Sequence, residues 1–140
     1  LQILARHLGI DAITHFAGRV PRALIYSAIK GFDIAAVPSR EEGFGLSAIE
    51  AMAAGVPVVA SRVDALQEIV VDNATGLLCP AEDPVSLADA LARLVADAAL
   101  RQRMGAAGVA HVELSYDSPA FRGQLAALLT GLGLPVRALA

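Results

Sequence analysis

The sequence predicts an α/β protein in which helices cover a parallel sheet. Short apolar runs, such as residues 34–37 and 56–60, alternate with amphipathic helical segments, which is typical of βα units. These runs are apolar at every position, as expected for strands that are buried on both faces. The composition, 56% hydrophobic with 4% aromatic residues, fits buried strands packed against alanine-rich helices.

Size, charge and cysteine content further limit the classes of protein and the partners that fit this sequence. A chain of 140 residues forms one domain at most and can bury roughly two-thirds of its unfolded surface. The formal net charge is -3, there is no tryptophan, and the basic residues are scattered, so we expect no nucleic-acid partner. The single cysteine, Cys79, follows an apolar run, which predicts a buried thiol in a reducing, cytoplasmic setting.

The first elements are predicted from helical periodicity and from strand-like runs. Residues 1–8 carry a helical stripe of leucines that ends at Gly9. Residues 10–16 are expected to form a short strand. A turn at 17–21 then leads into a helix that begins at Pro21, a residue favoured at the first helical position, and runs to about residue 30. The pattern starts in mid-helix without methionine, so we expect a fragment of a longer protein.

The middle of the chain predicts two further βα units. The apolar strand at 34–37 is followed by a glycine-containing loop and a helix at 46–54, and the next strand covers 56–60. Asp64 is expected to cap a short helix that runs to residue 70, with Gln67 completing a capping box. A turn at 72–76 precedes a fourth strand at 77–79.

The last third is predicted to be helical. Asp83 before Pro84 marks a helix start, and an apolar face follows at Leu87, Ala88, Leu91, Leu94 and Val95. A second helix around residues 100–111 is expected to be interrupted by Gly105 and Gly108. A third helix is expected from Ser118, with a loose tail at 131–140.

Together these elements predict a Rossmann-like sheet with helices on both faces. In such sheets ligands bind at the carboxyl ends of the strands, where the turn at 18–21 and the loop at 38–45 both lie. The second loop carries the densest set of functional residue types. Gly43 and Gly45 permit a close backbone approach, and the helix that follows offers free N–H groups to an anion. Glu42 and Glu50, eight positions apart, are carboxylates that accept hydrogen bonds from vicinal hydroxyls.

This region resembles the group 1 family of retaining glycosyltransferases with the two-domain GT-B fold. The resemblance is carried by residues 38–58, with the Glu42-x7-Glu50 spacing, and extends to 14–18 and 72–78. It implies the C-terminal half of a GT-B fold, with residues 1–130 forming a partial nucleotide-sugar-binding domain. The implied ligand is a nucleoside diphosphate sugar, with no cofactor and no metal ion.

The resemblance also implies individual roles. Glu42 would contact the transferred sugar at the reacting carbon and act as the catalytic carboxylate, and Glu50 would bind the ribose hydroxyls. Backbone N–H groups of the donor-binding residues Gly43, Phe44, Gly45 and Leu46 would bind the diphosphate or the sugar of the donor. The turn formed by Gly18, Arg19 and Val20 would contact the nucleobase. The alternatives are a solvated loop glutamate, an ordinary helix-surface glutamate, a core Phe44 and a surface arginine.

Two features of this sequence differ from what the resemblance implies for a complete enzyme of the family. Asp64-Ala65 stands where the family usually has Gly-Gly before a glutamate, here Glu68, which puts the donor geometry at this loop in question. The Arg and Lys that neutralise the donor diphosphate in the family, and the N-terminal acceptor domain, would precede Leu1. We therefore expect no transfer by these 140 residues alone, and the resemblance leaves room for membrane association of the parent protein.

A second hypothesis from another class is a non-catalytic, nucleotide-binding Rossmann-like module. A dehydrogenase is disfavoured because Gly43-Phe-Gly45 lacks the third glycine of the dinucleotide motif. A nucleotide-sugar epimerase is disfavoured by the glutamate pair. The three histidines are too widely spaced for a metal set. The sequence does not predict the base, the sugar or the acceptor.

Overall fold

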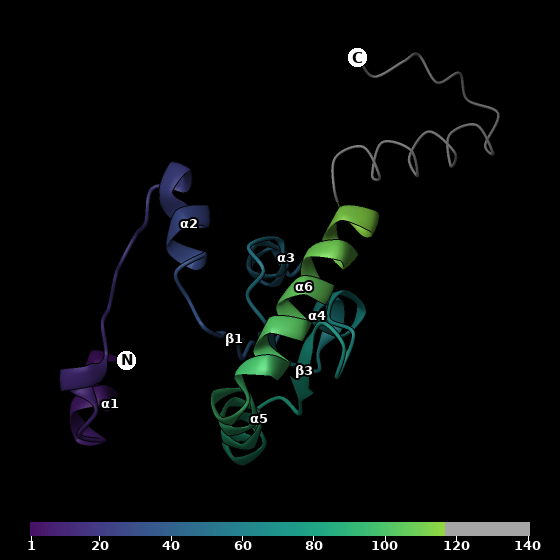
Figure 1. The fold of residues 1–140 in the computed structure, drawn as a ribbon. Helices are drawn as coiled ribbons and strands as arrows, with labels where there is room; N and C mark the ends of the chain where they lie inside the picture. The colour runs from purple at the N-terminus through teal and green to yellow at the C-terminus, as the bar shows by residue number, and fades with distance from the viewer. Residues whose placement is uncertain (117–140) are drawn as a thin grey trace.

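The structure is a computed structural model that describes residues 1–116 of the chain. Within these residues helices dominate and three short strands lie between them (Figure 1). The elements in order are α1 (Gln2–His7), the 3-10 helix η1 (Asp11–Ile13), α2 (Arg22–Ile29), β1 (Ala35–Val37), α3 (Leu46–Ala53), β2 (Val58–Ser61), α4 (Asp64–Ile69), β3 (Gly76–Cys79), α5 (Pro84–Ala96) and α6 (Ala98–Ser115). The expected helix after Ser118 and the tail at 131–140 lie outside the described residues.

The three strands form one parallel sheet in the order β1-β2-β3. Helix α3 connects β1 to β2, and α4 connects β2 to β3, so each connection is a βα unit. Ala36 pairs with Val59, and Val59 pairs with Leu77, which aligns the carboxyl ends of the strands at one edge. This edge is where ligands bind in parallel α/β sheets.

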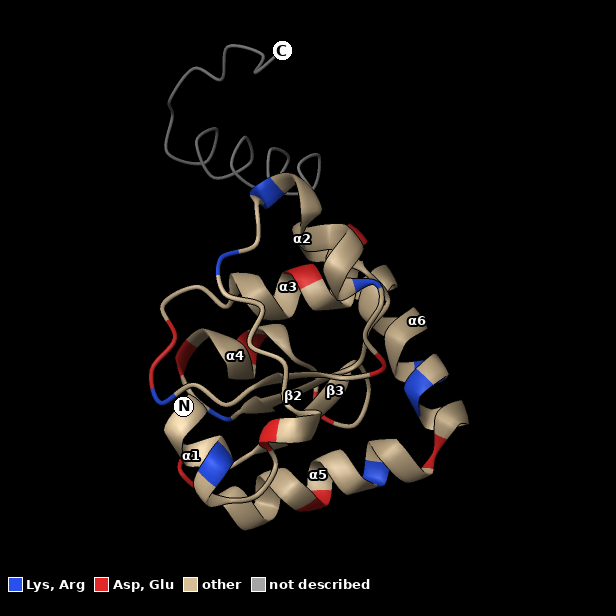
Figure 2. Cartoon of the chain, turned by 90° about the vertical axis from the view of Figure 1, so that its left-hand side faces the viewer, with Lys and Arg blue, Asp and Glu red and all other residues tan. Residues whose placement is uncertain are grey.

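The central strand β2 is buried on both faces, and its side chains alternate between two cores. Val58 and Ala60 pack with Met52 of α3 and with α4, whereas Val59 packs with Leu94 of α5 and with the first half of α6. Figure 2 shows α3 above the strands and α5 below them. Helices on both faces of a parallel sheet are therefore confirmed.

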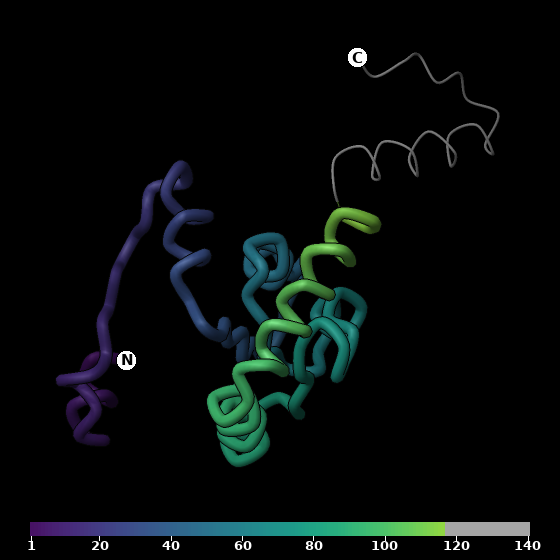
Figure 3. Tube along the Cα trace, in the orientation of Figure 1, coloured from purple at the N-terminus to yellow at the C-terminus, as the bar shows by residue number. Residues whose placement is uncertain are grey.

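The predicted strand at residues 10–16 is wrong. Residues 11–13 form the 3-10 helix η1, and the Thr14 hydroxyl donates to the carbonyl of Ile10 at 2.7 Å. Residues 14–21 belong to no helix or strand, and they pair with no strand of the described chain, because β1 pairs only with β2. Residues 1–21, which we call the N-terminal arm, run well apart from β1 in the trace (Figures 1 and 3). A segment with a strand-like pattern forms a strand only where a neighbouring strand supplies hydrogen bonds. The described residues therefore contain three strands, where four were expected.

Helix α4 begins differently from the prediction. Val63 is its N-cap and Asp64 its first residue, and the N-cap makes no side-chain hydrogen bond, so the predicted capping box is wrong. Asp64 has a φ of 35°, outside the usual range for a non-glycine residue. Its carboxylate instead accepts the N–H of Glu42, in the loop at residues 38–45. By contrast, the predicted cap of α5 is confirmed, since Asp83 accepts the N–H groups of Val85 and Ser86.

The predicted interruption of the helix around residues 100–111 is also wrong, since α6 is continuous from Ala98 to Ser115. Gly105 and Gly108 are both buried within it. A Cβ at Gly105 would fall against the carbonyl oxygen of Gly55, and one at Gly108 would lie 3.3 Å from Cβ of Met52. Both glycines allow α6 to lie close to α3 and to the turn that follows it.

Asp72 joins the turn at 72–76 to the sheet, and the pH dependence of this contact can be predicted. Burial raises the pKa of Asp72, but the Leu78 N–H at 3.0 Å and the hydrogen bond and charge of Arg62 at 2.6 Å outweigh it, leaving the pKa below 3.8. A carboxyl with a lowered pKa in the folded state stabilises the fold above its unfolded pKa. This contribution is lost as the pH falls from 3.8 through the lower folded value.

We therefore expect Asp72→Asn to lower the free energy of unfolding by roughly 1 kcal/mol at pH 7, because the Arg62 partner is half-exposed. The difference from wild type should shrink as the pH falls below 3.8. Urea unfolding at a series of pH values measures it. Asp89→Asn, which removes an exposed carboxylate from α5, is the control and should show no such trend. A pH-independent difference would contradict the assignment.

No helix within residues 1–116 is both long enough and apolar enough to cross a membrane.

Candidate functional site

The loop at residues 38–45 follows β1 at the carboxyl edge of the sheet and leads directly into α3. Gly45 is the N-cap of α3, with a φ of 74° in the left-handed region that favours glycine. A Cβ at this position would lie 2.5 Å from Cδ1 of Ile69 and 3.4 Å from Cδ2 of Leu66, both in α4. The backbone conformation therefore favours glycine here, and a Cβ would also force the end of the Ile69 side chain to move.

The side chain of Glu42 folds back onto this loop. One carboxylate oxygen accepts the N–H of Gly45 at 3.1 Å, and the other accepts the hydroxyl of Ser39 at 3.4 Å. A carboxylate at a helix N-terminus satisfies a free donor and interacts favourably with the helix dipole. The predicted catalytic residue thus also orders the loop. Ser39 was not identified from the sequence, and no spacing rule marks it.

Four backbone N–H groups around the start of α3 remain without a hydrogen-bond partner in residues 1–116. They belong to Gly43, Phe44, Leu46 and Ser47. The side chains of Phe44 and Leu46 are 65% and 52% exposed, so the alternative of a core Phe44 is wrong. The loop and the first turn of α3 therefore present backbone donors and apolar surface together, which suits an anionic ligand with an attached ring.

An open hollow of about 660 Å³ lies beside the loop and is lined by Glu41, Glu42, Gly43 and Asp64, which we call the acidic hollow. Asp64 reaches it from the start of α4, where its Oδ2 accepts the Glu42 N–H at 3.1 Å. No lysine or arginine lines this hollow. The hollow itself therefore offers backbone N–H groups but no full positive charge to a bound phosphate, and Arg40 of the same loop is paired with Glu82.

Glu50 lies one turn into α3 and is half-buried. Within residues 1–116 its carboxylate makes no hydrogen bond and no ion pair. Both carboxylate oxygens therefore remain free for a ligand. It is not among the residues that line the acidic hollow, so the two glutamates of the motif occupy neighbouring but separate positions.

The turn predicted to meet the nucleobase lies in the N-terminal arm. Gly18 has a φ of 64°, Arg19 is exposed and Val20 is half-buried. Helix α2, which starts directly after this turn, packs against α3. None of the three residues lines the acidic hollow, so their role in donor binding stays a prediction.

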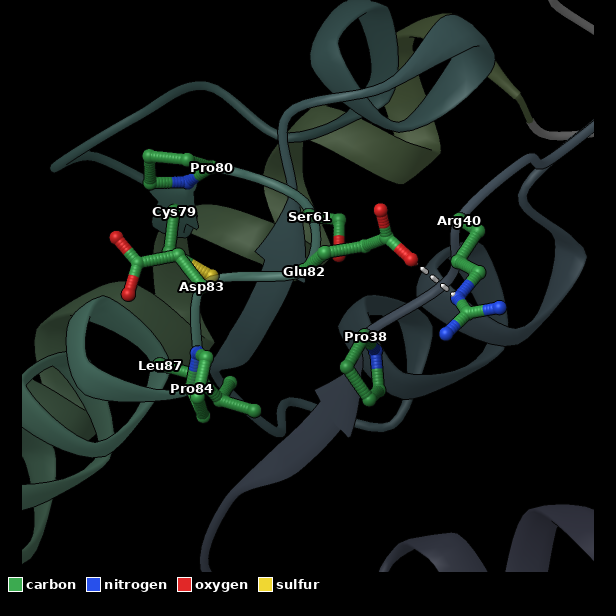
Figure 4. Close-up of a pocket in the computed structure, with 9 residues that line it drawn as sticks. All are labelled: Pro38, Arg40, Ser61, Cys79, Pro80, Glu82, Asp83, Pro84 and Leu87. Carbon is green, nitrogen blue, oxygen red and sulfur yellow. Dashed lines mark ion pairs between the residues drawn. The ribbon is translucent and has the colours of Figure 1, made fainter.

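A second pocket, of about 370 Å³, lies where all three strands end (Figure 4). Figure 4 shows Arg40 paired with Glu82 across its mouth, at 2.8 Å. Cys79 lines the pocket. Burial raises the pKa of this thiol, and its Sγ lies 3.5 Å from the carbonyl oxygen of Ala60. The predicted buried cysteine is confirmed, and the charged groups of this pocket are already paired or used in capping α5.

Residues 1–116 contain no group of three or more histidine, cysteine or carboxylate side chains placed to hold a metal ion. The expectation of a metal-independent site stays a prediction. The charge balance of a bound diphosphate must then be met by groups other than those lining the acidic hollow, whose side chains are carboxylates.

Comparison with known proteins agrees with this fold. Residues 1–111 match the family described as "Glycosyl transferases group 1". D-inositol 3-phosphate glycosyltransferase from Kribbella flavida is 43% identical over 110 residues, covering 79% of this chain and 26% of that protein.

Two solved structures give the same result at the level of the fold. Sucrose-phosphate synthase from Thermosynechococcus elongatus superposes with a TM-score of 0.86 at 34% identity, covering 94% of this chain and 33% of that one. Anabaena HepE, solved in complex with UDP, has a TM-score of 0.86 at 25% identity, covering 93% of this chain and 35% of that one.

The chain belongs to the group 1 glycosyltransferase family, and its fold is that of the C-terminal half of a GT-B enzyme. It spans about a quarter of the length of the curated relatives reported first among its matches. The predicted fold class is thereby confirmed, whereas the roles of individual site residues stay predictions.

Proposed function

We propose that this chain supplies the donor-binding half of a retaining glycosyltransferase that uses a nucleoside diphosphate sugar. The observation that carries the proposal is the placement of Glu42 and Glu50 around the start of α3, with four N–H groups between them that have no hydrogen-bond partner among residues 1–116. Glu42 stands beside the acidic hollow, where the sugar would bind. Glu50 keeps both carboxylate oxygens free for the two ribose hydroxyls.

The nature of the donor is inferred from relatives. HepE was solved with UDP, and the curated relative is named for transfer to an inositol phosphate. We infer UDP as the nucleotide and leave the acceptor to the part of the parent that would carry the acceptor domain. A free, buried cysteine fits the reducing cytoplasm, where we place the activity.

In this reaction the bond between the anomeric carbon and the leaving diphosphate breaks, and positive charge develops on the sugar. A carboxylate at Glu42 would stabilise that charge electrostatically. The leaving diphosphate would receive hydrogen bonds from the N–H groups of Gly43, Phe44 and Leu46 at the positive end of α3. Retention at the anomeric carbon is proposed from the family resemblance.

The proposal predicts that these 140 residues bind a donor weakly and do not transfer its sugar. The N–H groups that would receive the leaving diphosphate carry only partial positive charge, and within residues 1–116 no basic side chain lines the acidic hollow beside them. Incubation with UDP-glucose and a panel of acceptors, including inositol phosphate, should yield no glycoside by mass spectrometry. Glycoside formed by the purified chain would contradict the prediction that groups needed for sugar transfer lie outside these 140 residues.

A nucleotide titration tests the proposed function directly. Ligand-observed NMR with UDP, GDP and ADP should show binding of one nucleotide, expected to be UDP, with a dissociation constant on the order of millimolar. Amide shifts in the protein should be centred on residues 43–47. A folded chain that binds no nucleotide would reject the proposal, and binding centred elsewhere would favour the non-catalytic module.

A further inference from the structure

Asp64 connects two segments that are distant in the sequence. Its Oδ2 accepts the N–H of Glu42 at 3.1 Å, across 22 positions of the chain. The next residue, Ala65, donates its own N–H to the carbonyl oxygen of Glu42 at 3.4 Å. The start of α4 therefore holds the backbone of Glu42 on both its donor and its acceptor side.

This contact is made at a backbone position that is unfavourable for a side chain. The φ of Asp64 is 35°, in the left-handed region, where residues other than glycine are uncommon and aspartate is among the better tolerated. Glycine would relax the backbone at this position but would remove the acceptor for Glu42. The strain therefore accompanies a contact that glycine cannot make.

The contact propagates through Glu42 to the rest of the loop. With its backbone held by α4, Glu42 also directs its carboxylate to the Gly45 N–H at the start of α3. Between these two fixed points lie Gly43 and Phe44, whose N–H groups have no partner within residues 1–116. The spacing of the unpaired donors beside the acidic hollow thus depends on both anchors.

We propose that Asp64 is a positioning residue for the sugar end of the donor: it fixes the backbone of Glu42 and thereby orders the loop beside the acidic hollow. The inference rests on the proposed donor-binding function. It assigns Asp64 to the recognition of the sugar and not of the nucleotide, because its contact is with Glu42 and not with Glu50 or with the turn at 18–20.

Three variants separate positioning from charge. Asp64→Asn keeps an acceptor oxygen at the same place and removes the charge. Asp64→Gly removes the acceptor and relaxes the backbone. Glu41→Gln is the matched control, since it removes a carboxylate from the same hollow at an exposed residue that makes no side-chain hydrogen bond within residues 1–116.

The first readout is hydrogen exchange of the Glu42 amide, measured by NMR on the 140-residue chain without ligand. Asp64→Gly should accelerate this exchange by about tenfold, because the amide loses its acceptor. Asp64→Asn and Glu41→Gln should leave it close to the wild-type rate. Unchanged protection in Asp64→Gly would overturn the inference.

The second readout is the affinity for UDP-glucose relative to UDP. In the wild type the sugar should strengthen binding, and Asp64→Gly should abolish that gain while the dissociation constant for UDP stays within about twofold. Asp64→Asn should retain the gain. Equal gains in Asp64→Gly and wild type, or no gain in the wild type, would overturn the inference while UDP binding still supported the proposed function. Absence of UDP binding would instead reject the proposed function, and the inference with it.

Discussion

Gly105→Ala is expected to lower the free energy of unfolding by about 3 kcal/mol, one of the two largest effects predicted for this chain. In an isolated helix the same substitution would stabilise the helix by roughly 1 kcal/mol, because glycine is a poor helix former. The opposite sign is expected here because Gly105 is buried in α6 against the backbone of Gly55.

The cost arises from what the new methyl group would meet. Its Cβ would fall on the carbonyl oxygen of Gly55, with the carbonyl carbon only 3.0 Å away. A backbone carbonyl cannot move aside as the end of a long side chain can, so α6 would have to shift away from the turn after α3. That shift would loosen the contact of Gly108 with Met52, in the core beneath α3.

Gly108→Ala is the matched control in the same helix. Its Cβ would lie 3.3 Å from Cβ and 3.4 Å from Cγ of the Met52 side chain, which can adjust by a few tenths of an ångström. We expect the gain in helix propensity to offset the tighter packing, leaving a net change within about 1 kcal/mol. Urea unfolding followed by circular dichroism measures both variants. Equal stabilities of the two variants would show that the Gly55 contact does not determine the packing of α6.

These two glycines also show where prediction from the sequence stopped. Glycine within a helical pattern was interpreted as an interruption because its local effect is unfavourable. The compensation comes from Gly55, fifty positions earlier in the chain, and no local pattern carries that information. Elements whose signals are local were predicted well, as with α5, whose start follows from Asp83 and Pro84.

The error at residues 10–16 has a similar physical origin. The run has strand-like residues, but a strand exists only when a neighbour supplies a hydrogen-bonded ladder, and β1 does not lie beside it. The candidate site likewise combines residues that a local motif predicts with a long-range contact that it does not predict. Glu42, Gly43 and Glu50 were identified from a contiguous motif, whereas the contact of Asp64 with Glu42 joins the start of α4 to a loop 22 positions earlier. The sequence marked Asp64 as a helix cap and as a departure from the family pattern, and neither interpretation predicts its contact with Glu42.

Glu50→Ala is expected to weaken UDP binding by about tenfold or more, without destabilising the fold. Loss of hydrogen bonds between a carboxylate and the ribose hydroxyls corresponds to roughly 1.5–3 kcal/mol, which is a factor of ten to a hundred in affinity. Stability should change by less than about 0.5 kcal/mol, because Glu50 makes no hydrogen bond or ion pair within residues 1–116. Both quantities are measurable on the same preparation, by NMR titration and by urea unfolding.

A modified ligand tests whether the affinity lost in Glu50→Ala comes from contacts with the ribose. UDP that lacks both the 2′- and 3′-hydroxyls should bind the wild type as weakly as UDP binds Glu50→Ala, and it should bind the variant with the same affinity as the wild type. Glu113→Ala, an exposed glutamate on α6, is the control and should leave both affinities unchanged. A variant that loses affinity for UDP and for the dideoxy ligand to the same extent would place Glu50 outside the ribose contact. Its carboxylate would then act on the diphosphate or on the start of α3, and the role implied by the family resemblance would not hold for this chain.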